Sequence, residues 1–167
     1  MHPEAQAGMA KMLAESGIDT QLPWTGLDVG GRLINTSTRH LLPNTRWTGL
    51  DIKPGPDVDV VHDAATWIPD RLFDVVISTE LFEHTAVWPE ILATCAAALG
   101  PGGYLFITCA STGRPAHGAE GTFVVPADEH YGNVDPVELE TVLRRHFVDA
   151  QVTYQFPPGD AYARARN

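Results

Sequence analysis

Residues 25–31 read Thr-Gly-Leu-Asp-Val-Gly-Gly, an apolar run that carries one aspartate and ends in two glycines. The run predicts a β-strand as far as Val29, and Gly30 and Gly31 predict a turn at which the backbone can come close to a ligand. Four further runs, rich in β-branched, aromatic and other apolar residues, also predict strands: 47–52, 58–62, 73–78 and 104–108.

Apolar residues at helical spacing lie on both sides of the first strand. Residues 3–16 predict a helix, with Pro3 in its first turn, Gly17 after its end, and one apolar face made of Ala5, Met9, Met12 and Leu13. Residues 35–42 predict a weakly helical stretch that Pro43 terminates.

The second half of the chain continues this alternation. Residues 88–99 predict a helix that stops at the Gly-Pro-Gly-Gly segment 100–103. A last helix begins at Asp135, where Pro and Glu follow in the positions of an Asp-based capping box. Two terminal runs, 148–156 and 161–165, predict an antiparallel hairpin.

This order of elements predicts an α/β fold, a mostly parallel, twisted, seven-stranded sheet with helices on both faces and a terminal hairpin. A chain of 167 residues fits one domain, 1–167, in which residues 1–23 form an N-terminal helical flank. Residues 111–134 are irregular and rich in Gly, Pro and His. We interpret them as a lid on the substrate side, and the alternative is a disordered insertion.

The composition restricts location and partners. The formal net charge is −10 and the pI is about 4.9, so the chain repels nucleic-acid backbones and anionic membranes. Residues 1–14 lack the apolar stretch of a signal peptide or membrane span, which predicts a cytoplasmic protein. Cys95 and Cys109 have no CxxC spacing and predict buried, reduced thiols.

Polar residues and glycines follow four of the predicted parallel strands. They are Asp28 with Gly30 and Gly31, Asp51, Asp63, and Ser78 with Glu80. Because ligands of open α/β sheets bind at the carboxyl ends of the strands, we expect these residues to line one crevice. Asp51 ends the second strand, where a carboxylate can accept hydrogen bonds from both hydroxyls of a ribose.

Two common nucleotide sites are excluded by spacing. Gly30-Gly31 continues as Arg-Leu-Ile-Asn, which lacks the later glycines of the G-x-G-x-x-G dinucleotide fingerprint. The sequence contains no Gly-Lys-Ser/Thr, so a P-loop is also absent.

Five segments together resemble class I, Rossmann-like S-adenosylmethionine-dependent methyltransferases, especially the small-molecule branch. They are Leu-Asp-Val-Gly (27–30), Thr-Gly-Leu-Asp-Ile (48–52), Phe-Asp-Val-Val-Ile-Ser (73–78), Glu-Leu-Phe-Glu-His (80–84) and Leu-Gly-Pro-Gly-Gly-Tyr (99–104). The resemblance spans about residues 24–156 and implies S-adenosylmethionine as cofactor, with S-adenosylhomocysteine as product.

The resemblance also implies roles for individual residues. Asp28 would organise the loop of Gly30 and Gly31 against the methionine part of the cofactor, and Asp51 would bind the ribose. The remaining implied contacts are with the adenine for Ile52, Asp63 and Ala64, and with the methionine and sulfonium end for Ser78 and Glu80. The family loop Gly-x-Gly-x-Gly is not complete here; polar side chains from Asn35 to Arg39 would replace part of its backbone contact.

Three histidines are candidates for a general base, because imidazole titrates near neutral pH: His84, His117 and His130. The alternatives are that His84 stabilises a neighbouring helix and that the other two are solvated loop residues. Without HxxxH or HExxH spacing we predict no metal site. Asp51 and Asp63 could likewise cap turns.

The sequence therefore predicts methyl transfer to an unidentified, small-molecule acceptor by in-line displacement. A strand end of Ser-Thr-Glu-Leu (78–81) disfavours nucleobase methylation, whose enzymes carry an Asp/Asn-Pro-Pro-Tyr/Phe type of sequence there. The alternative is a non-catalytic module that binds the cofactor or a partner, and a nicotinamide oxidoreductase fails on the glycine spacing. The oligomeric state stays open.

Overall fold

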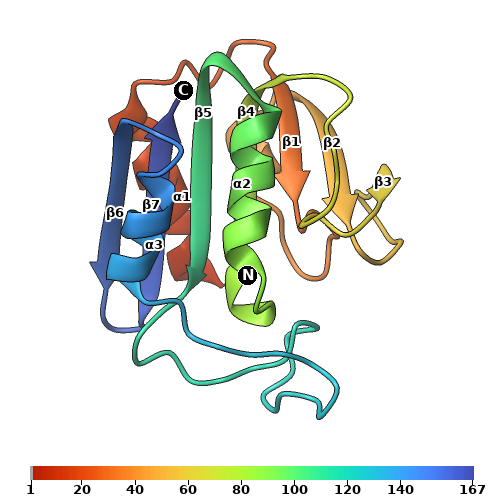
Figure 1. Cartoon of the computed structure of the whole chain (residues 1–167), viewed down its shortest axis with the longest axis vertical. Helices are drawn as coiled ribbons and strands as arrows, with labels where there is room; N and C mark the ends of the chain where they lie inside the picture. The colour runs from red at the N-terminus through yellow and green to blue at the C-terminus, as the bar shows by residue number, and fades with distance from the viewer. Residues whose placement is uncertain (1) are drawn as a thin grey trace.

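The computed structural model describes residues 2–167 and contains one seven-stranded sheet in the order β3-β2-β1-β4-β5-β7-β6 (Figure 1). Strands β1 to β5 run parallel, and β7 runs antiparallel to both β5 and β6. The fold predicted from the sequence is confirmed. The strands are Thr25–Val29 (β1), Arg46–Asp51 (β2), Val60–Val61 (β3), Phe73–Thr79 (β4), Leu99–Ala110 (β5), Asp149–Gln155 (β6) and Asp160–Arg166 (β7).

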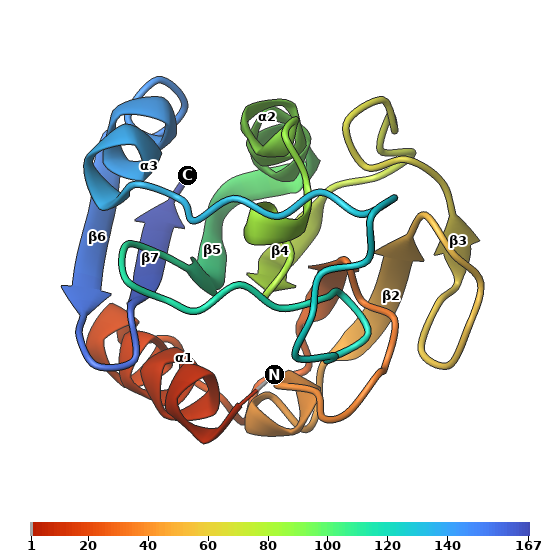
Figure 2. The same ribbon diagram turned by 90° about the horizontal axis from the view of Figure 1, so that it is seen from below.

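Helices lie on both faces of this sheet, as Figure 2 shows when the sheet is viewed along its strands. Helix α1 (Pro3–Ser16) covers one face, where its residues Met9, Met12 and Leu13 pack with side chains of β4 and β5. Helices α2 (Trp88–Ala98) and α3 (Pro136–Leu143) cover the other face and bury the larger apolar cluster.

The ends of these helices follow the predicted signals. Helix α1 ends at Gly17, whose φ of 71° lies in the left-handed region that glycine adopts at low cost. Helix α3 begins after Asp135, whose carboxylate accepts hydrogen bonds from the backbone N–H groups of Val137 and Glu138. Both helices and their buried faces are confirmed.

The predicted weak helix over residues 35–42 is wrong. The structure has one 3₁₀ turn there, η1 (Arg39–Leu41), in an otherwise irregular connection. The segment contains Asn, Thr and Ser, whose side chains compete for backbone groups, and Ser37 Oγ accepts a hydrogen bond from Arg39 N at 3.1 Å. The side chain of Arg39 is also drawn into the core, as described below.

Two strands differ in length from the prediction. β3 is reduced to two residues, and β5 begins at Leu99 rather than Tyr104. Leu99 pairs with Phe73, and the register then shifts so that Val75 pairs with Tyr104. A bulge therefore absorbs the Gly-Pro-Gly-Gly segment that predicted a turn.

Residues 112–133 contain no helix or strand, and an isolated bridge between Ser111 and Val134 closes the segment at its base. The segment crosses the carboxyl ends of the central strands (Figure 2). Cys95 and Cys109 are free and buried, as predicted. Within residues 2–167, no helix is long and apolar enough to cross a membrane.

The replacement of Gly49 by alanine tests how closely β2 packs at its carboxyl end. A Cβ there would lie 1.8 Å from the carbonyl oxygen of Asp57 and 2.7 Å from Arg39 Nη2, so the backbone must shift. We expect Gly49→Ala to lower the free energy of unfolding by about 1–3 kcal/mol in urea titrations. Gly100→Ala is the control, because its nearest contact is at 3.5 Å. Equal stabilities for the two variants would contradict this packing.

Candidate active site

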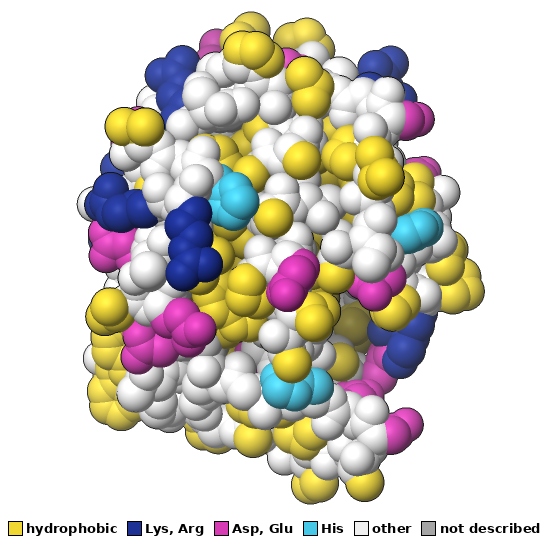
Figure 3. Space-filling model, viewed as in Figure 1, with side chains coloured by type: hydrophobic (Ala, Val, Ile, Leu, Met, Phe, Trp, Pro, Cys, Tyr) yellow, Lys and Arg dark blue, Asp and Glu magenta, His cyan; other side chains and the backbone are white. Residues whose placement is uncertain are grey.

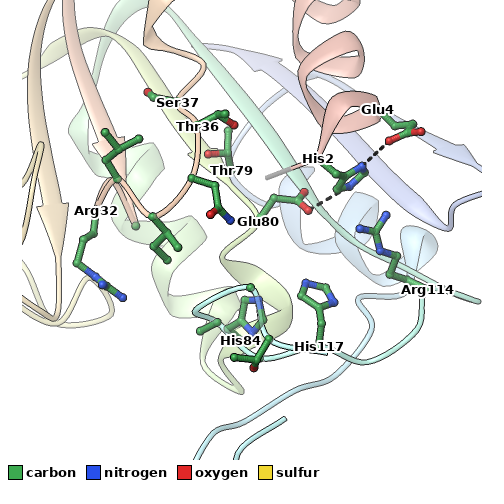
Figure 4. Close-up of a pocket in the computed structure, with 18 of the residues that line it drawn as sticks. His2, Glu4, Arg32, Thr36, Ser37, Thr79, Glu80, His84, Arg114 and His117 are labelled. Carbon is green, nitrogen blue, oxygen red and sulfur yellow. Dashed lines mark hydrogen bonds and ion pairs between the residues drawn. The ribbon is translucent and has the colours of Figure 1, made fainter. Parts of the chain in front are cut away.

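A cavity of about 690 Å³ opens at the carboxyl ends of β1 and β4 (Figure 4). The chain leaves β1 toward β2 and β3 on one side and returns to β4 on the other, so the strand order reverses at this point. Such a switch point is where open α/β sheets bind ligands. The walls come from the ends of β1 and β4, residues 30–37, the start of α1 and part of the segment 111–134.

The buried carboxylate of Asp28 forms the floor of the cavity next to β1. Arg39 Nε donates a hydrogen bond to Asp28 Oδ2 at 2.8 Å, and Arg39 Nη2 donates to the carbonyl oxygen of Asp57 at 2.9 Å. Burial raises the pKa of Asp28, and the Arg39 guanidinium opposes this increase. Asp28 Oδ1 is also buried and has no hydrogen-bond partner within residues 2–167.

The two glycines after β1 bring the backbone to the cavity wall. Gly30 has a φ of 75°, and the N–H groups of Gly30 and Gly31 both donate to the carbonyl oxygen of Leu50, at 2.8 and 3.1 Å. A Cβ on Gly31 would lie 2.7 Å from the Asp28 carbonyl oxygen. Glycine is therefore required at both positions, for conformation at the first and for space at the second.

Glu80 follows β4 with a φ of 54°, in the left-handed region that non-glycine residues rarely adopt. Its backbone N–H donates to the carbonyl oxygen of Thr108 at 2.8 Å, and Thr108 Oγ1 donates to Glu80 Oε1 at 3.0 Å. Local strain of this kind persists where surrounding contacts hold a functional residue in place. The carboxylate of Glu80 is thereby directed toward the cavity (Figure 4).

The imidazole of His2 pairs with the carboxylate of Glu80. Its Nε2 lies 3.3 Å from both Glu80 Oε2 and Asp160 Oδ2, while Nδ1 lies 2.9 Å from Glu4 Oε2. Burial lowers the pKa of His2. The carboxylates of Glu80 and Glu4 together raise it by more, so the pKa of His2 lies above its ordinary value. Burial alone would raise the pKa of Glu80. The hydrogen bond and the charge of His2 outweigh the effect of burial, so the pKa of Glu80 is lowered.

The opposite end of the cavity carries two histidines. His84, in the 3₁₀ turn η2 (Phe82–His84), has its ring centroid 5.1 Å from that of His117, and Tyr131 lies within 5.6 Å of both rings. Burial, followed by the neighbouring His117, lowers the pKa of His84 to about 4. Glu83 is fully buried beside them, and burial together with the charge of Glu80 raises its pKa well above the ordinary value.

The structure brings some of the predicted site residues together at this cavity and not others. Those that line it are Asp28, Gly30, Gly31, Asn35, Glu80, His84 and His117. Asp51 lies next to it, where its Oδ2 accepts a hydrogen bond from the backbone N–H of Arg32 at 3.3 Å. The other predicted site residues that do not line the cavity are Ile52, Asp63, Ala64, Ser78 and His130.

The two carboxylates outside the lining accept hydrogen bonds from nearby backbone N–H groups. Asp63 Oδ1 accepts a hydrogen bond from Ala65 N at 2.9 Å, and Asp51 Oδ1 accepts one from Lys53 N at 2.9 Å, so both cap turns. Ala64 and Ser78 are buried, and Ile52 is 67% exposed. The proposed ligand contacts of these residues and of His130 stay predictions.

Sequence reasoning missed His2, Arg32 and Arg114, which also line the cavity. Arg32 Nη2 lies 2.5 Å from Glu120 Oε1 and so joins the glycine loop to the segment 111–134. Arg114 Nη1 lies 3.0 Å from Asp160 Oδ1. The position of Arg32 directly after the glycines was an available signal, whereas nothing in the local sequence distinguishes His2 or Arg114.

The face that carries α2 and α3 shows acidic and basic side chains scattered among apolar and neutral ones, with no broad basic area (Figure 3). This distribution agrees with the net negative charge of the chain. A phosphate backbone would find little attraction on this face.

Comparison with known proteins places the chain in a family. A family model described as a methyltransferase domain matches residues 7–146, and the chain belongs to this family. Ubiquinone biosynthesis O-methyltransferase from Proteus mirabilis is 31% identical over 146 residues, covering 80% of this chain and 57% of that protein. The protein of the same name from Caulobacter vibrioides is 34% identical over 85 residues, covering 50% of this chain and 30% of that protein. The chain thus spans less than two thirds of these relatives.

Solved structures show the same fold at lower identity. The structure of a complex of DhpI with S-adenosylhomocysteine matches with a TM-score of 0.68 and 20% identity, covering 98% of this chain and 84% of that one. Burkholderia thailandensis 1,6-didemethyltoxoflavin-N1-methyltransferase, with 1,6-didemethyltoxoflavin and S-adenosylhomocysteine bound, matches with a TM-score of 0.66 and 19% identity, covering 99% of this chain and 77% of that one.

The environment of His84 predicts an unusual titration. Because burial and His117 disfavour its charged form, we expect the ring to stay neutral as the pH falls from 7 to 5 and to titrate near pH 4. NMR chemical shifts of the imidazole, measured in the presence of a chelator and assigned with His84→Gln, check this. Titration of His84 near its ordinary value of 6.5 would contradict the burial of this ring.

Proposed function

We propose that the chain is an S-adenosylmethionine-dependent methyltransferase that acts on a small-molecule acceptor. The observation that carries the proposal is the cavity of about 690 Å³ at the β1/β4 switch point, lined by Asp28, the two glycines and Glu80, in a chain of the methyltransferase domain family. Its volume falls in the ordinary range of small-molecule sites.

The residues present fit this cofactor. When bound, it supplies an activated methyl group on a sulfonium. Glu80 and Asp28 place negative charge beside the cavity, which favours a cationic ligand, and the unpartnered Oδ1 of Asp28 is an acceptor for a donor on such a ligand. Asp51 would hold the ribose, with Ile52, Asp63 and Ala64 around the adenine. The cationic end would compete with His2 for the carboxylate of Glu80.

Methyl transfer from a sulfonium requires alignment of the acceptor and exclusion of water more than it requires a particular catalytic side chain. We assign both tasks to residues 111–134, acting as a lid. Residues 1–23 form the flank, which contains α1 and contributes His2 and Glu4 to the cavity. The ion pairs of Glu120 with Arg32 and Lys53 support the lid, because they join it to the loop that follows β1 and to the end of β2.

The relatives named as O-methyltransferases favour a hydroxyl oxygen as the methyl acceptor, and the cavity favours a compact molecule. A nitrogen acceptor is the alternative, supported by the N1-methyltransferase with the same fold. The free cysteines, Cys95 and Cys109, support a reducing compartment, and we place the protein in the cytoplasm.

Calorimetric titration with S-adenosylhomocysteine tests the cofactor site. We expect micromolar binding by the chain, and at least about tenfold weaker binding by Asp51→Asn, since hydrogen bonds to a charged group contribute about 1.5–3 kcal/mol. Asp70→Asn is the matched control, because it removes the same charge from an exposed position outside the cavity. A nicotinamide dinucleotide should not bind.

The results separate the possible functions. Folded protein that does not bind S-adenosylhomocysteine would overturn the proposal. Binding without methyl transfer to any hydroxyl or amine acceptor would favour the non-catalytic module instead.

Hydrogen exchange tests the lid. If residues 111–134 close over the ligand, their backbone amides should exchange severalfold more slowly when S-adenosylhomocysteine is saturating, because ordered segments open less often. Helix α3 serves as the reference within the same molecule. Unchanged exchange of the segment, in protein shown to bind the ligand, would assign these residues to a passive surface loop.

A further inference from the structure

Three potential metal ligands meet at the end of the cavity that faces the segment 111–134. Glu83 and His84 come from η2, and His117 comes from the segment itself. Each offers one ligand atom, and the three atoms lie within 4.8 Å of one another. Figure 4 shows the rings of His84 and His117 beside each other at this end, away from the pair of His2 and Glu80.

The buried groups of this cluster lack partners. Glu83 is 0% exposed, and neither of its carboxylate oxygens has a hydrogen-bond partner in the described part of the chain. The same holds for Nδ1 of His84. Buried polar groups are nearly always hydrogen-bonded or bound to an ion, because leaving them unpaired costs free energy. A cation between them would satisfy both groups.

The third ligand is oriented as metal-binding histidines usually are. Nδ1 of His117 lies 3.2 Å from the carbonyl oxygen of Pro115, so a proton on Nδ1 donates to that oxygen and leaves the lone pair of Nε2 free. Tyr131 packs against both imidazoles, and the N–H of Gly132 donates to the carbonyl oxygen of Glu83 at 2.8 Å. These contacts hold the segment next to η2.

We propose that Glu83, His84 and His117 bind a divalent first-row transition-metal ion, of which Zn²⁺ is the first probe. Two imidazoles and one carboxylate form a donor set that such ions accept, with ligand distances of about 2.1 Å. Two ligands of a tetrahedral ion are then about 3.4 Å apart, so ligand atoms that now lie within 4.8 Å of one another move closer by up to about 1.4 Å when the ion binds. His117 can supply this movement, because it lies on a segment without regular structure.

The three residues come from distant parts of the sequence, which explains why ligand spacing predicted no metal site. Three protein ligands leave at least one coordination position for another molecule. His84 and His117 line the cavity. If the proposed methyl transfer holds, the ion would bind the acceptor oxygen at the remaining position and favour its deprotonated form. The catalytic role rests on the proposed function, whereas ion binding does not.

Calorimetric titration of chelator-treated, full-length protein with ZnCl₂ tests the site without cofactor or acceptor. We expect one ion per chain, and His117→Ala to weaken binding by about tenfold or more. His146→Ala is the matched control, because it removes an exposed histidine elsewhere in the chain. Glu83→Gln, which keeps the shape of the side chain, should weaken binding similarly; circular dichroism checks that each variant is folded.

A second measurement identifies the ligands directly. X-ray absorption of the zinc-loaded protein should show nitrogen and oxygen neighbours and no sulfur, since neither cysteine belongs to the cluster. Absence of stoichiometric binding, equal affinity of His117→Ala and His146→Ala, or a sulfur neighbour would each overturn the proposal. Titration of the same samples with S-adenosylhomocysteine shows separately whether the cofactor site has failed.

Discussion

The ion pair of Arg39 and Asp28 holds together the end of the sheet on which the site is built. The guanidinium extends from the connection after β1, meets the buried carboxylate at the end of that strand, and binds the carbonyl oxygen of Asp57 in the loop after β2. Removing one partner of such a pair leaves an uncompensated charge in the core, which is costly. Gly31 and Gly49 leave the space that the guanidinium fills, because a Cβ at either position would lie within 3 Å of Nη2.

This arrangement explains what the sequence could and could not predict. Strands and helices followed from periodicity and from local signals such as Gly17 and Asp135, because these depend on neighbours in the chain. The shared strand edge followed from parallel topology, so Asp28, Gly30 and Glu80 were predicted to lie together. The conformation of residues 35–42 was not predictable, since the side chain of Arg39 there is fixed by Asp28 and Asp57, which lie outside the segment.

The contacts that distant segments make at the cavity were also not predictable from the sequence. His2, near the start of the sequence, reaches Glu80 in its middle and Asp160 near its end, and His117 reaches η2 from a segment with no periodicity. Asp51 and Asp63, in contrast, were predicted as ligand contacts but lie outside the lining of the cavity. A carboxylate after a strand predicts a ligand contact and a turn cap equally well, and the structure contains both caps.

The position of His2 has a practical consequence for preparing the protein. Its side chain lies in the cavity among three carboxylates, so a change at this end of the chain disturbs the binding site directly. Asn167 lies at the opposite ends of the strands, where its backbone N–H donates to the carbonyl oxygen of Gly103 (Figure 1). Purification tags and surface-attachment linkers therefore belong at the carboxyl terminus, away from the contacts that His2 makes in the cavity.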